Sequence, residues 1–524
     1  MRNKPDTLEK KLYQLIISRL DGDKIHSQEY QDMIFELISK GIGGFIIFGG
    51  KRDEVRPFIA NMQYASEIPL FIASDIEQGV GRQIASTTMF PCQMAVRAAI
   101  NRDRPEDIAL LRDAIRAIAS EAIDIGINMP LIPVLDVNQN PDNPIICTRA
   151  FSDNPEDVSW FGSEYIRVLE DSGLISCAKH FPGHGDTAID SHISLPLICK
   201  SYAGLMSTDI LPFKEAIRTG VSSIMAGHLN VTSLDSIPAS LSKKVISGLL
   251  RKELGFGGLV ITDALNMSAL SGIDNVPARC IDAGVDILLH PADADLTVME
   301  LISAIRYKLL DERMIDAAIG RIIKAKAKIK HINRAEIDPH KHNILSRRIT
   351  EMSITLVKYK PGILPVTLNP LSLRDRDKVS VGLLSGETFM PLRGTKEHEN
   401  VIPTKVGIQN NGLVLDFCFR RNDVGEVLSG EISIFAIFSK TAAWRGFSGI
   451  SEEEKTQISG LIRKAKKSIV ISFGSPYILR HFKEADILIA AYDAGEQAQE
   501  AVVKCLKGER AFTGQMPVKV SLSF

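Results

Sequence analysis

The sequence lacks several features that mark particular classes of protein. It contains no stretch near the roughly 20 consecutive apolar residues that cross a bilayer. Residues 1–6 are polar and lack the apolar core and cleavage site of a signal peptide. Lys and Arg number 62 against 63 Asp and Glu, so there is no excess of basic charge for nucleic acid or an anionic membrane. We therefore expect a cytoplasmic protein with no nucleic-acid or membrane partner.

Cysteine is scarce and scattered. The seven cysteines are odd in number and never have C-x-x-C spacing, which argues against a disulfide framework and against a zinc site. We expect buried, reduced thiols at Cys92, Cys147, Cys177, Cys199, Cys280, Cys418 and Cys505.

Short apolar runs alternate with longer amphipathic stretches up to about residue 330. Stretches such as Pro105–Ile125 and Pro155–Asp171 have helical patterns, and Pro105 stands at an expected helix start. Strands alternating with helices predict a parallel sheet, and eight strands predict a TIM-type (β/α)8 barrel over residues 1–330. The eight runs are Leu12–Leu20, Gly43–Phe48, Leu70–Ser74, Ile127–Val134, Leu174–Ala178, Ser222–Ala226, Leu259–Thr262 and Val285–Leu289.

A second α/β series follows a polar segment. Residues 331–350 show no strand pattern and are expected to form a linker. Residues 351–524 contain further strand-length runs with helical segments between some of them, which predicts a doubly wound C-terminal α/β sandwich domain. The runs are Ile354–Val357, Val379–Leu384, Leu413–Phe417, Ile432–Phe438, Ile469–Phe473 and Ile487–Ala491, and the stretch 391–408 is expected to be a loop.

Polar residues follow most of the predicted barrel strands. The C-terminal strand ends of a TIM barrel all face one mouth, where active sites are built. The sequence therefore predicts that distant residues converge on one pocket. His228 and His290 are equally well explained as core or wall residues and receive no role. The residues at the strand ends are Asp75, Lys179, His180, His228, Asp263 and His290.

The stretch 179–192, KHFPGHGDTAIDSH, concentrates titratable groups in one glycine-rich loop. Its closing pair, Asp190 and His192, has the spacing at which a carboxylate orients an imidazole for proton transfer. An isolated Asp-x-His is more often a surface pair, and Asp263 alone would suit a helix N-cap. The stretch also supplies metal-ligand types, but Lys179 argues against a metal site, and the Pro-Gly turn between His180 and His184 rules out the helix that would make their spacing a metal-binding one. The possible ligands are His180, His184, Asp186, Asp190 and His192.

The segment DIEQGVGR, from Asp75 to Arg82, combines an acid, glycines and an arginine. It lacks the G-x-x-x-x-G-K-[ST] pattern, so a phosphate-binding P-loop is excluded. A carboxylate at the end of a strand can instead accept hydrogen bonds from two sugar hydroxyls.

Several of these motifs resemble glycoside hydrolase family 3, in particular its β-N-acetylhexosaminidase branch. KHFPGHGDTAIDSH resembles the branch signature K-H-[FI]-P-G-H-G-x(4)-D-S-H, and ITDALNM resembles the family's nucleophile motif. DIEQGVGR resembles its D-x-E-x-G segment, and residues 148–151 its R-[SA]-F element. The second domain resembles the family's α/β sandwich domain as far as Gly514-Gln515-Met516-Pro517-Val518.

The resemblance implies a role for each matching residue. It makes Asp263 the nucleophile, His192 the acid/base and Asp190 the partner of His192. It places a second group around a non-reducing N-acetylglucosamine: Asp75, Arg82, Arg149, Lys179 and His180. Arg82 departs from the branch pattern D-x-E-G-G-R-V-x-R, because one fewer residue precedes it.

The implied activity is that of a retaining β-N-acetylglucosaminidase (EC 3.2.1.52) without metal or organic cofactor. The implied substrates are oligosaccharides or peptidoglycan fragments that end in N-acetylglucosamine, as in cell-wall recycling. Three alternatives stay open. A histidine acid/base could allow phosphate to replace water, as in a phosphorylase. A β-glucosidase of the same family would share the fold, and an inactive sugar-binding protein would share the pocket. The sequence does not fix the oligomeric state.

Overall fold

The computed structural model describes residues 4–189, 191, 193–329, 337–366, 379–385, 432–439 and 449–521. The chain divides into two compact units. The first holds most residues up to Arg348, and the second holds most residues from Ile349 onward together with Ala98–Ile100. Each unit is described below by itself.

The first unit is built around a closed parallel sheet. One set of strands has the order β10-β1-β2-β3-β4 and another has the order β5-β7-β9. Parallel bridges from Val134 to Lys179 and from Ile261 to Ile287 join the two sets at both sides. The predicted eight-stranded barrel is therefore confirmed. Its strands are β1 (Ile16–Asp21), β2 (Gly44–Phe48), β3 (Phe71–Ser74), β4 (Met129–Pro130), β5 (Cys177–Phe181), β7 (Ser223–Ala226), β9 (Leu259–Thr262) and β10 (Leu288–Leu289).

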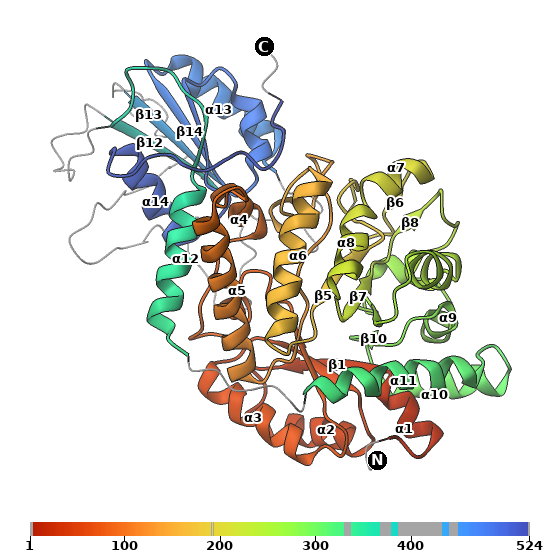
Figure 1. Cartoon of the computed structure of the whole chain (residues 1–524). Helices are drawn as coiled ribbons and strands as arrows, with labels where there is room; N and C mark the ends of the chain where they lie inside the picture. Colours follow the sequence, from red (N-terminus) through yellow and green to blue (C-terminus); the bar gives the residue numbers. More distant parts are fainter. Residues whose placement is uncertain are drawn as a thin grey trace, which may run out of the picture. The chain divides into compact units, whose positions relative to one another are not determined.

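Helices surround these strands (Figure 1). Two of them have the bounds that the sequence predicts, because their ends carry clear signals. Pro105 occupies the first turn of α5 (Pro105–Ile125), and Gly126 ends it at φ 98°. The side chain of Asn154 caps α6 (Pro155–Asp171). The others are α1 (Leu8–Gln14), α2 (Gln28–Ser39), α3 (Arg52–Ala65), α4 (Gln93–Ala99), α7 (Tyr202–Ser207), α8 (Leu211–Thr219), the π-helix η4 (Lys244–Glu253), α9 (Val276–Ala283), α10 (Ala294–Arg306) and α11 (Glu312–Ile329).

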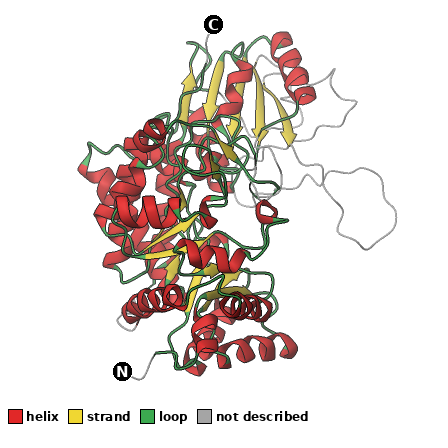
Figure 2. Cartoon of the chain, turned by 90° about the vertical axis from the view of Figure 1, so that its right-hand side faces the viewer, coloured by secondary structure: helices red, strands yellow, loops and turns green. Residues whose placement is uncertain are grey.

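The second unit contains a five-stranded sheet of order β11-β15-β14-β13-β12, in which only β11 is antiparallel to its neighbour. Strand residues are buried on both faces, with Ile434 and Ile471 on one and Phe435 and Val470 on the other. Helices flank the sheet (Figure 2), so the predicted second α/β domain is confirmed. Helix α12 (Pro339–Ser353) belongs to the first unit up to Arg348 and to the second from Ile349. The second unit also contains β11 (Thr355–Lys358), β12 (Val379–Ser385), β13 (Ile432–Phe438), α13 (Glu452–Lys464), β14 (Ser468–Phe473), β15 (Ile487–Ala490) and α14 (Glu496–Leu506).

Several boundaries differ from the sequence prediction. The fourth strand, expected at 127–134, covers Met129–Pro130, and the eighth, expected at 285–289, covers Leu288–Leu289. The run expected as the first strand from Leu12 is helical up to Gln14. The fifth strand, expected at 174–178, lies at 177–181. Residues 339–350 of the expected linker belong to α12. The expected strand Leu413–Phe417 and the expected loop 391–408 lie outside the described residues.

The division of the chain into domains at residues 330 and 350 stays a proposal.

No helix in the described part of the chain is long and apolar enough to cross a membrane.

Candidate active site

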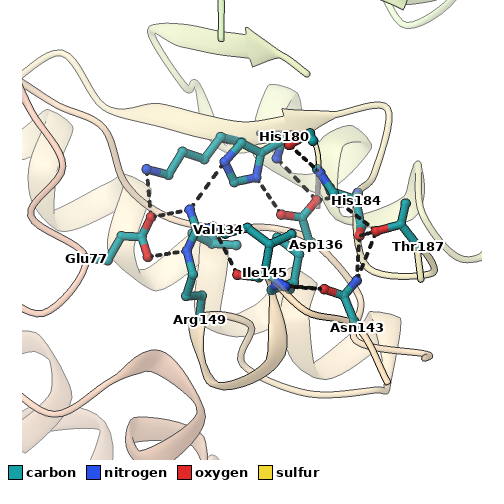
Figure 3. A network of polar contacts seen from close by, with 12 residues as sticks. Glu77, Val134, Asp136, Asn143, Ile145, Arg149, His180, His184 and Thr187 are labelled. Carbon is teal, nitrogen blue, oxygen red and sulfur yellow. Dashed lines mark hydrogen bonds and ion pairs between the residues drawn. The ribbon is translucent and has the colours of Figure 1, made fainter. Parts of the chain in front are cut away.

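Two carboxylates and two cations form a cluster at the C-terminal ends of β3 and β5. The Lys179 ammonium donates to Asp75 Oδ1 at 2.6 Å and lies 2.8 Å from Glu77 Oε1. The Arg149 guanidinium donates to both carboxylate oxygens of Glu77, at 2.9 and 2.8 Å. We call Asp75, Glu77, Arg149 and Lys179 the charged quartet. Figure 3 shows the fork of Arg149 facing Glu77.

Within the quartet, burial and the neighbouring charges shift the pKa values in opposite directions. Burial works to raise the pKa of the Glu77 carboxyl, but Arg149 and Lys179 outweigh it and hold that pKa well below its usual value. Burial likewise works against the charge of Lys179, yet Asp75 and Glu77 raise its pKa. All the groups with shifted pKa values are thereby kept ionised. Asp75 is the most exposed of the four, with 37% of its side chain accessible against 1% for Lys179.

A buried aspartate organises the residues that follow. Asp136 is fully buried, and its Oδ2 accepts a 2.7 Å hydrogen bond from Nδ1 of His180. Its Oδ1 accepts from the backbone N–H of His184 at 2.6 Å. Burial works to raise the pKa of Asp136, but His180 and His184 outweigh it and lower that pKa. Figure 3 shows Asp136 between the two histidines. Asp136 therefore links the end of β5 to the loop beyond it.

His184 holds that loop from inside. Its Nδ1 lies 2.9 Å from Thr187 Oγ1 and its Nε2 lies 3.0 Å from Ser191 Oγ. The Asn143 amide donates to the carbonyl of His184 at 2.9 Å. Burial lowers the pKa of His184 to about 4, so its ring is neutral at neutral pH. The loop is also packed tightly, because a Cβ on Gly185 would lie 1.8 Å from the carbonyl oxygen of Val137.

Asp263 directly follows β9, so it stands at the same mouth of the barrel as the ends of β3 and β5. Its Oδ1 accepts a 2.8 Å hydrogen bond from the backbone N–H of Ala264. Asp75 and Asp263, from opposite parts of the sequence, both raise the pKa of the Cys177 thiol, although burial is the larger cause. Buried His228 supports the turn after Asp263, with its Nε2 3.3 Å from the carbonyl oxygen of Ala264. Asp75, Lys179, His180 and Asp263 thus all stand at the C-terminal ends of their strands, and a hydrogen bond joins Lys179 to Asp75.

The remaining predicted site residues are Asp190, His192 and Arg82. Asp190 and His192, the predicted acid/base pair, lie outside the described residues. Arg82 is exposed at the end of the short helix η1 (Val80–Arg82), and the described structure shows no contact between its side chain and the quartet. Among the described residues, no group of His, Cys, Asp and Glu has an arrangement that could hold a metal ion.

Sequence reasoning missed Glu77 and Asp136. Glu77 lies two residues after Asp75, at the spacing that keeps side chains on one side of an extended chain. Asp136 lies two residues after the fourth predicted strand, one of three strands for which no strand-end residue was singled out. The same strand-end rule, applied to every strand, would have found Asp136.

Comparison with known families decides the classification. The sequence model described as "Glycosyl hydrolase family 3 N terminal domain" matches residues 7–325, which is more than half of the chain. The chain belongs to glycosyl hydrolase family 3. This is the family that the motifs resemble.

Curated family 3 relatives carry hexosaminidase names. The chain is 33% identical over 389 residues to "Beta-hexosaminidase A" of Pseudoalteromonas piscicida, which covers 66% of the chain and 64% of that protein. It is 28% identical over 350 residues to "Beta-N-acetylglucosaminidase/beta-glucosidase" of Cellulomonas fimi, covering 62% of the chain and 61% of that protein. The matches therefore span less than two thirds of the length of these relatives.

Solved family 3 structures share the fold over nearly the whole chain. A β-N-acetylglucosaminidase from Paenibacillus sp. str. FPU-7 is 25% identical, with a TM-score of 0.79 over 99% of this chain and 100% of that one. A β-glucoside phosphorylase is 22% identical, with a TM-score of 0.82 over 99% and 94% of the two chains, and this likeness concerns the fold.

Proposed function

We propose that this chain is a retaining β-N-acetylglucosaminidase that removes a β-linked N-acetylglucosamine from the non-reducing end of its substrate. The observation that carries the proposal is the charged quartet at the mouth of the barrel, where Asp263 also stands. Membership of family 3 and the hexosaminidase names of curated relatives support it.

The quartet is suited to a neutral sugar. Asp75 is its exposed edge and can accept hydrogen bonds from two neighbouring hydroxyl groups. Lys179 and Arg149 are ionised donors whose positions Glu77 fixes from behind. His180 stands beside Arg149, with its Nε2 3.4 Å from Nη2. We assign Asp75, Arg149, Lys179 and His180 to the sugar ring. Arg82 is assigned only by the motif.

The proposed reaction is a double displacement. Asp263 attacks the anomeric carbon and forms a glycosyl ester while His192 protonates the leaving oxygen. Water then releases the sugar, with His192 accepting the proton of that water and Asp190 orienting the imidazole. The N–H of Ala264 supports the nucleophile because its hydrogen bond favours the ionised carboxylate. No cofactor takes part.

The substrate class follows from the resemblance of residues 179–192 to the branch signature. We propose oligosaccharides or peptidoglycan fragments that end in N-acetylglucosamine, with a role in cell-wall recycling in the cytoplasm. The first comparison is hydrolysis of an aryl β-N-acetylglucosaminide against an aryl β-glucoside. A faster rate on the glucoside would replace the proposal with a β-glucosidase, and no turnover of either would favour a sugar-binding protein.

The covalent step has its own test. A 2-deoxy-2-fluoro glycosyl donor should leave a glycosyl mass on the peptide that contains Asp263, as read by mass spectrometry after digestion. Asp263→Ala should remove both the label and turnover. Asp282→Ala is a matched control, since that carboxylate pairs with Lys243 on the outside of the barrel. An active, correctly folded Asp263→Ala protein would refute the mechanism.

Water must also be distinguished from phosphate as the acceptor. The reaction is run with and without inorganic phosphate, and the products are separated by anion exchange. We expect free N-acetylglucosamine and an unchanged rate. Accumulation of the sugar 1-phosphate would identify a phosphorylase instead.

A further inference from the structure

Strand register places Arg19 inside the barrel. Ala73 of β3 and Asp75, which directly follows the strand, are two residues apart and alternate to the same face, and Asp75 contacts Lys179 of β5, two strands away in the barrel. Ala73 pairs with Ile46 of β2, and Ile46 pairs with Arg19 of β1. Side chains at paired positions of a parallel sheet point to the same face. Arg19 therefore belongs to the inward row that also carries Asp75, at the mouth end of its strand.

Arg19 is accessible although its row faces the barrel axis. Nearly half of its side chain, 49%, is exposed. Since the inward row ends at the mouth, this exposed surface faces the opening of the pocket. On the outward face of β1, by contrast, the surrounding helices would cover an arginine side chain.

Two rings accompany the guanidinium. The Arg19 guanidinium carbon lies 5.0 Å from the centre of the Phe48 ring, and the Phe48 and His290 rings are 5.9 Å apart. Phe48 and His290 are both half-buried. Burial, and then the charge of Arg19, lower the pKa of His290, while Asp75 opposes this shift. His290 thus lies within electrostatic reach of both Arg19 and the quartet, as a neutral ring that can donate one hydrogen bond.

Among the described residues, no acid lies within hydrogen-bond distance of the Arg19 guanidinium. Asp21 is its ion-pair partner, at 3.6 Å, which is longer than a hydrogen bond. Lys24 lies at the same 3.6 Å from Asp21 and shares its charge. Asp75, the other nearby acid, already accepts from Lys179 at 2.6 Å. A guanidinium fork stacked on an aromatic ring, with free donors, has the geometry that binds carboxylate or phosphate oxygens.

We propose that Arg19, Phe48 and His290 form a subsite at the barrel mouth that binds an oxyanion presented with the sugar substrate. The occupant is a carboxylate on the aglycone or an inorganic phosphate beside the sugar. The inference rests on the proposed function for the sugar pocket, because Asp75 and Asp263 define where the sugar lies. The subsite extends that pocket over β10, β1 and β2, the arc of the barrel that the quartet leaves unused.

The test compares two disaccharides that differ in one acid. Both have a non-reducing β-1,4-linked N-acetylglucosamine, and the reducing N-acetylglucosamine either carries a 3-O-lactyl carboxylate or does not. The readout is the ratio of kcat/KM for the acidic over the neutral substrate. Arg19→Gln should lower this ratio about 10- to 100-fold, the size of one charge-assisted contact. Arg19→Lys should recover part of it.

Arg116→Gln is the matched control. Arg116 is an exposed arginine of α5 that pairs with the exposed Asp113 and lies outside the barrel, so its loss removes a positive charge far from the subsite. This variant should leave the ratio unchanged. A second arm adds inorganic phosphate to the neutral substrate. A phosphate-dependent rate change that Arg19→Gln removes would identify phosphate as the occupant.

The outcomes separate the subsite from the activity. A ratio and a phosphate response that are both the same in wild type and Arg19→Gln would overturn the subsite while leaving the glycosidase intact. If the wild type cleaves neither disaccharide, the proposed function fails. The subsite is then decided by calorimetric titration of N-acetylmuramic acid and of phosphate, where equal affinity for wild type and Arg19→Gln would refute it.

Discussion

Asp136 accepts a 2.7 Å hydrogen bond from Nδ1 of His180, and this contact decides which nitrogen of the ring carries the proton. Because the carboxylate can only accept, the proton lies on Nδ1. Nε2 is then an acceptor for the guanidinium of Arg149, 3.4 Å away. Asp136, which contacts no substrate in our proposal, thus determines which nitrogen of the substrate-binding His180 donates and which accepts.

Asp136→Asn should therefore lower kcat/KM about 10- to 100-fold, the cost of one charged hydrogen bond. An amide NH₂ facing Nδ1 would move the proton to Nε2, where it would oppose the donors of Arg149. The measurement is kcat/KM on an aryl β-N-acetylglucosaminide. Asp107→Asn is the control. Asp107 is a buried acid of α5, away from the barrel mouth, and it accepts a hydrogen bond from the backbone N–H of Asn101. Equal losses in the two variants would contradict the assignment.

Glu77→Gln should raise KM and reduce stability. The substitution leaves the cations of Lys179 and Arg149 facing a single carboxylate, Asp75. Breaking a buried ion pair costs about 3–5 kcal/mol, which urea denaturation would detect. Glu164→Gln serves as a control of comparable burial, since Glu164 pairs with Arg112 on the helical layer. A variant of Glu77 with unchanged KM would show that the quartet does not hold the sugar.

The neutral ring of His184 predicts a loss of stability in acid. Its pKa is about 4 in the folded protein against 6.5 for the free group, so the unfolded chain takes up the proton first. The stability contribution is complete above pH 6.5 and falls as the pH drops towards 4, by about 3 kcal/mol in all. We expect the difference in unfolding free energy between wild type and His184→Gln to shrink by that amount over this range.

Buried Asp209 titrates in the same range with the opposite sign, because burial raises its pKa to about 6. Its contribution is present in both wild type and His184→Gln and cancels in their difference. A difference that does not change between pH 4 and pH 7 would mean that His184 is protonated in the folded protein.

Gly185→Ala should displace the loop after β5. The new methyl group would overlap the carbonyl oxygen of Val137, which is backbone and cannot rotate away. A shift of about 1 Å in catalytic groups costs roughly 100-fold in rate. Gly257→Ala is the control, since a Cβ there meets nothing within 4 Å. Equal activity of the two variants would show that the position of this loop does not matter for turnover.

Much of the fold could be predicted because its signals are local. Pro105 and Pro155 begin two helices at the expected residues, and the strand Leu259–Thr262 agrees with β9. β5 was placed three residues early because Lys179 and His180 resemble the start of a loop. At a barrel mouth, polar side chains that face the pocket can belong to the strand itself.

α12 could not be predicted from apolar spacing, because its buried face is largely polar. His342, Ser346, Thr350 and Ser353 are all buried, and His342 Nδ1 lies 2.7 Å from the buried carboxylate of Glu121. A helix that packs through hydrogen bonds has no hydrophobic stripe for the sequence to reveal.

Only the part of the site that stands at strand ends was predicted from the sequence. Asp75, Lys179 and Asp263 stand at strand ends, where the rule for barrels applies directly. Glu77 and Asp136 act through other side chains. Asp136 was missed because the strand-end rule was not applied to the fourth strand, and Glu77 was missed because it lies two residues beyond a strand-end acid. The assignments of Asp190 and His192 remain predictions from the motif.

The charged quartet has a further consequence for how the pocket responds to salt. Each carboxylate faces a cation within 3 Å, and the two signs balance. The charged quartet therefore produces little long-range electric field for mobile ions to screen, and it needs no counter-ion that a sugar would have to displace. An uncharged substrate would bind with the same affinity at low and at high salt concentration. A site that binds by balanced polarity, and not by net charge, works independently of ionic strength.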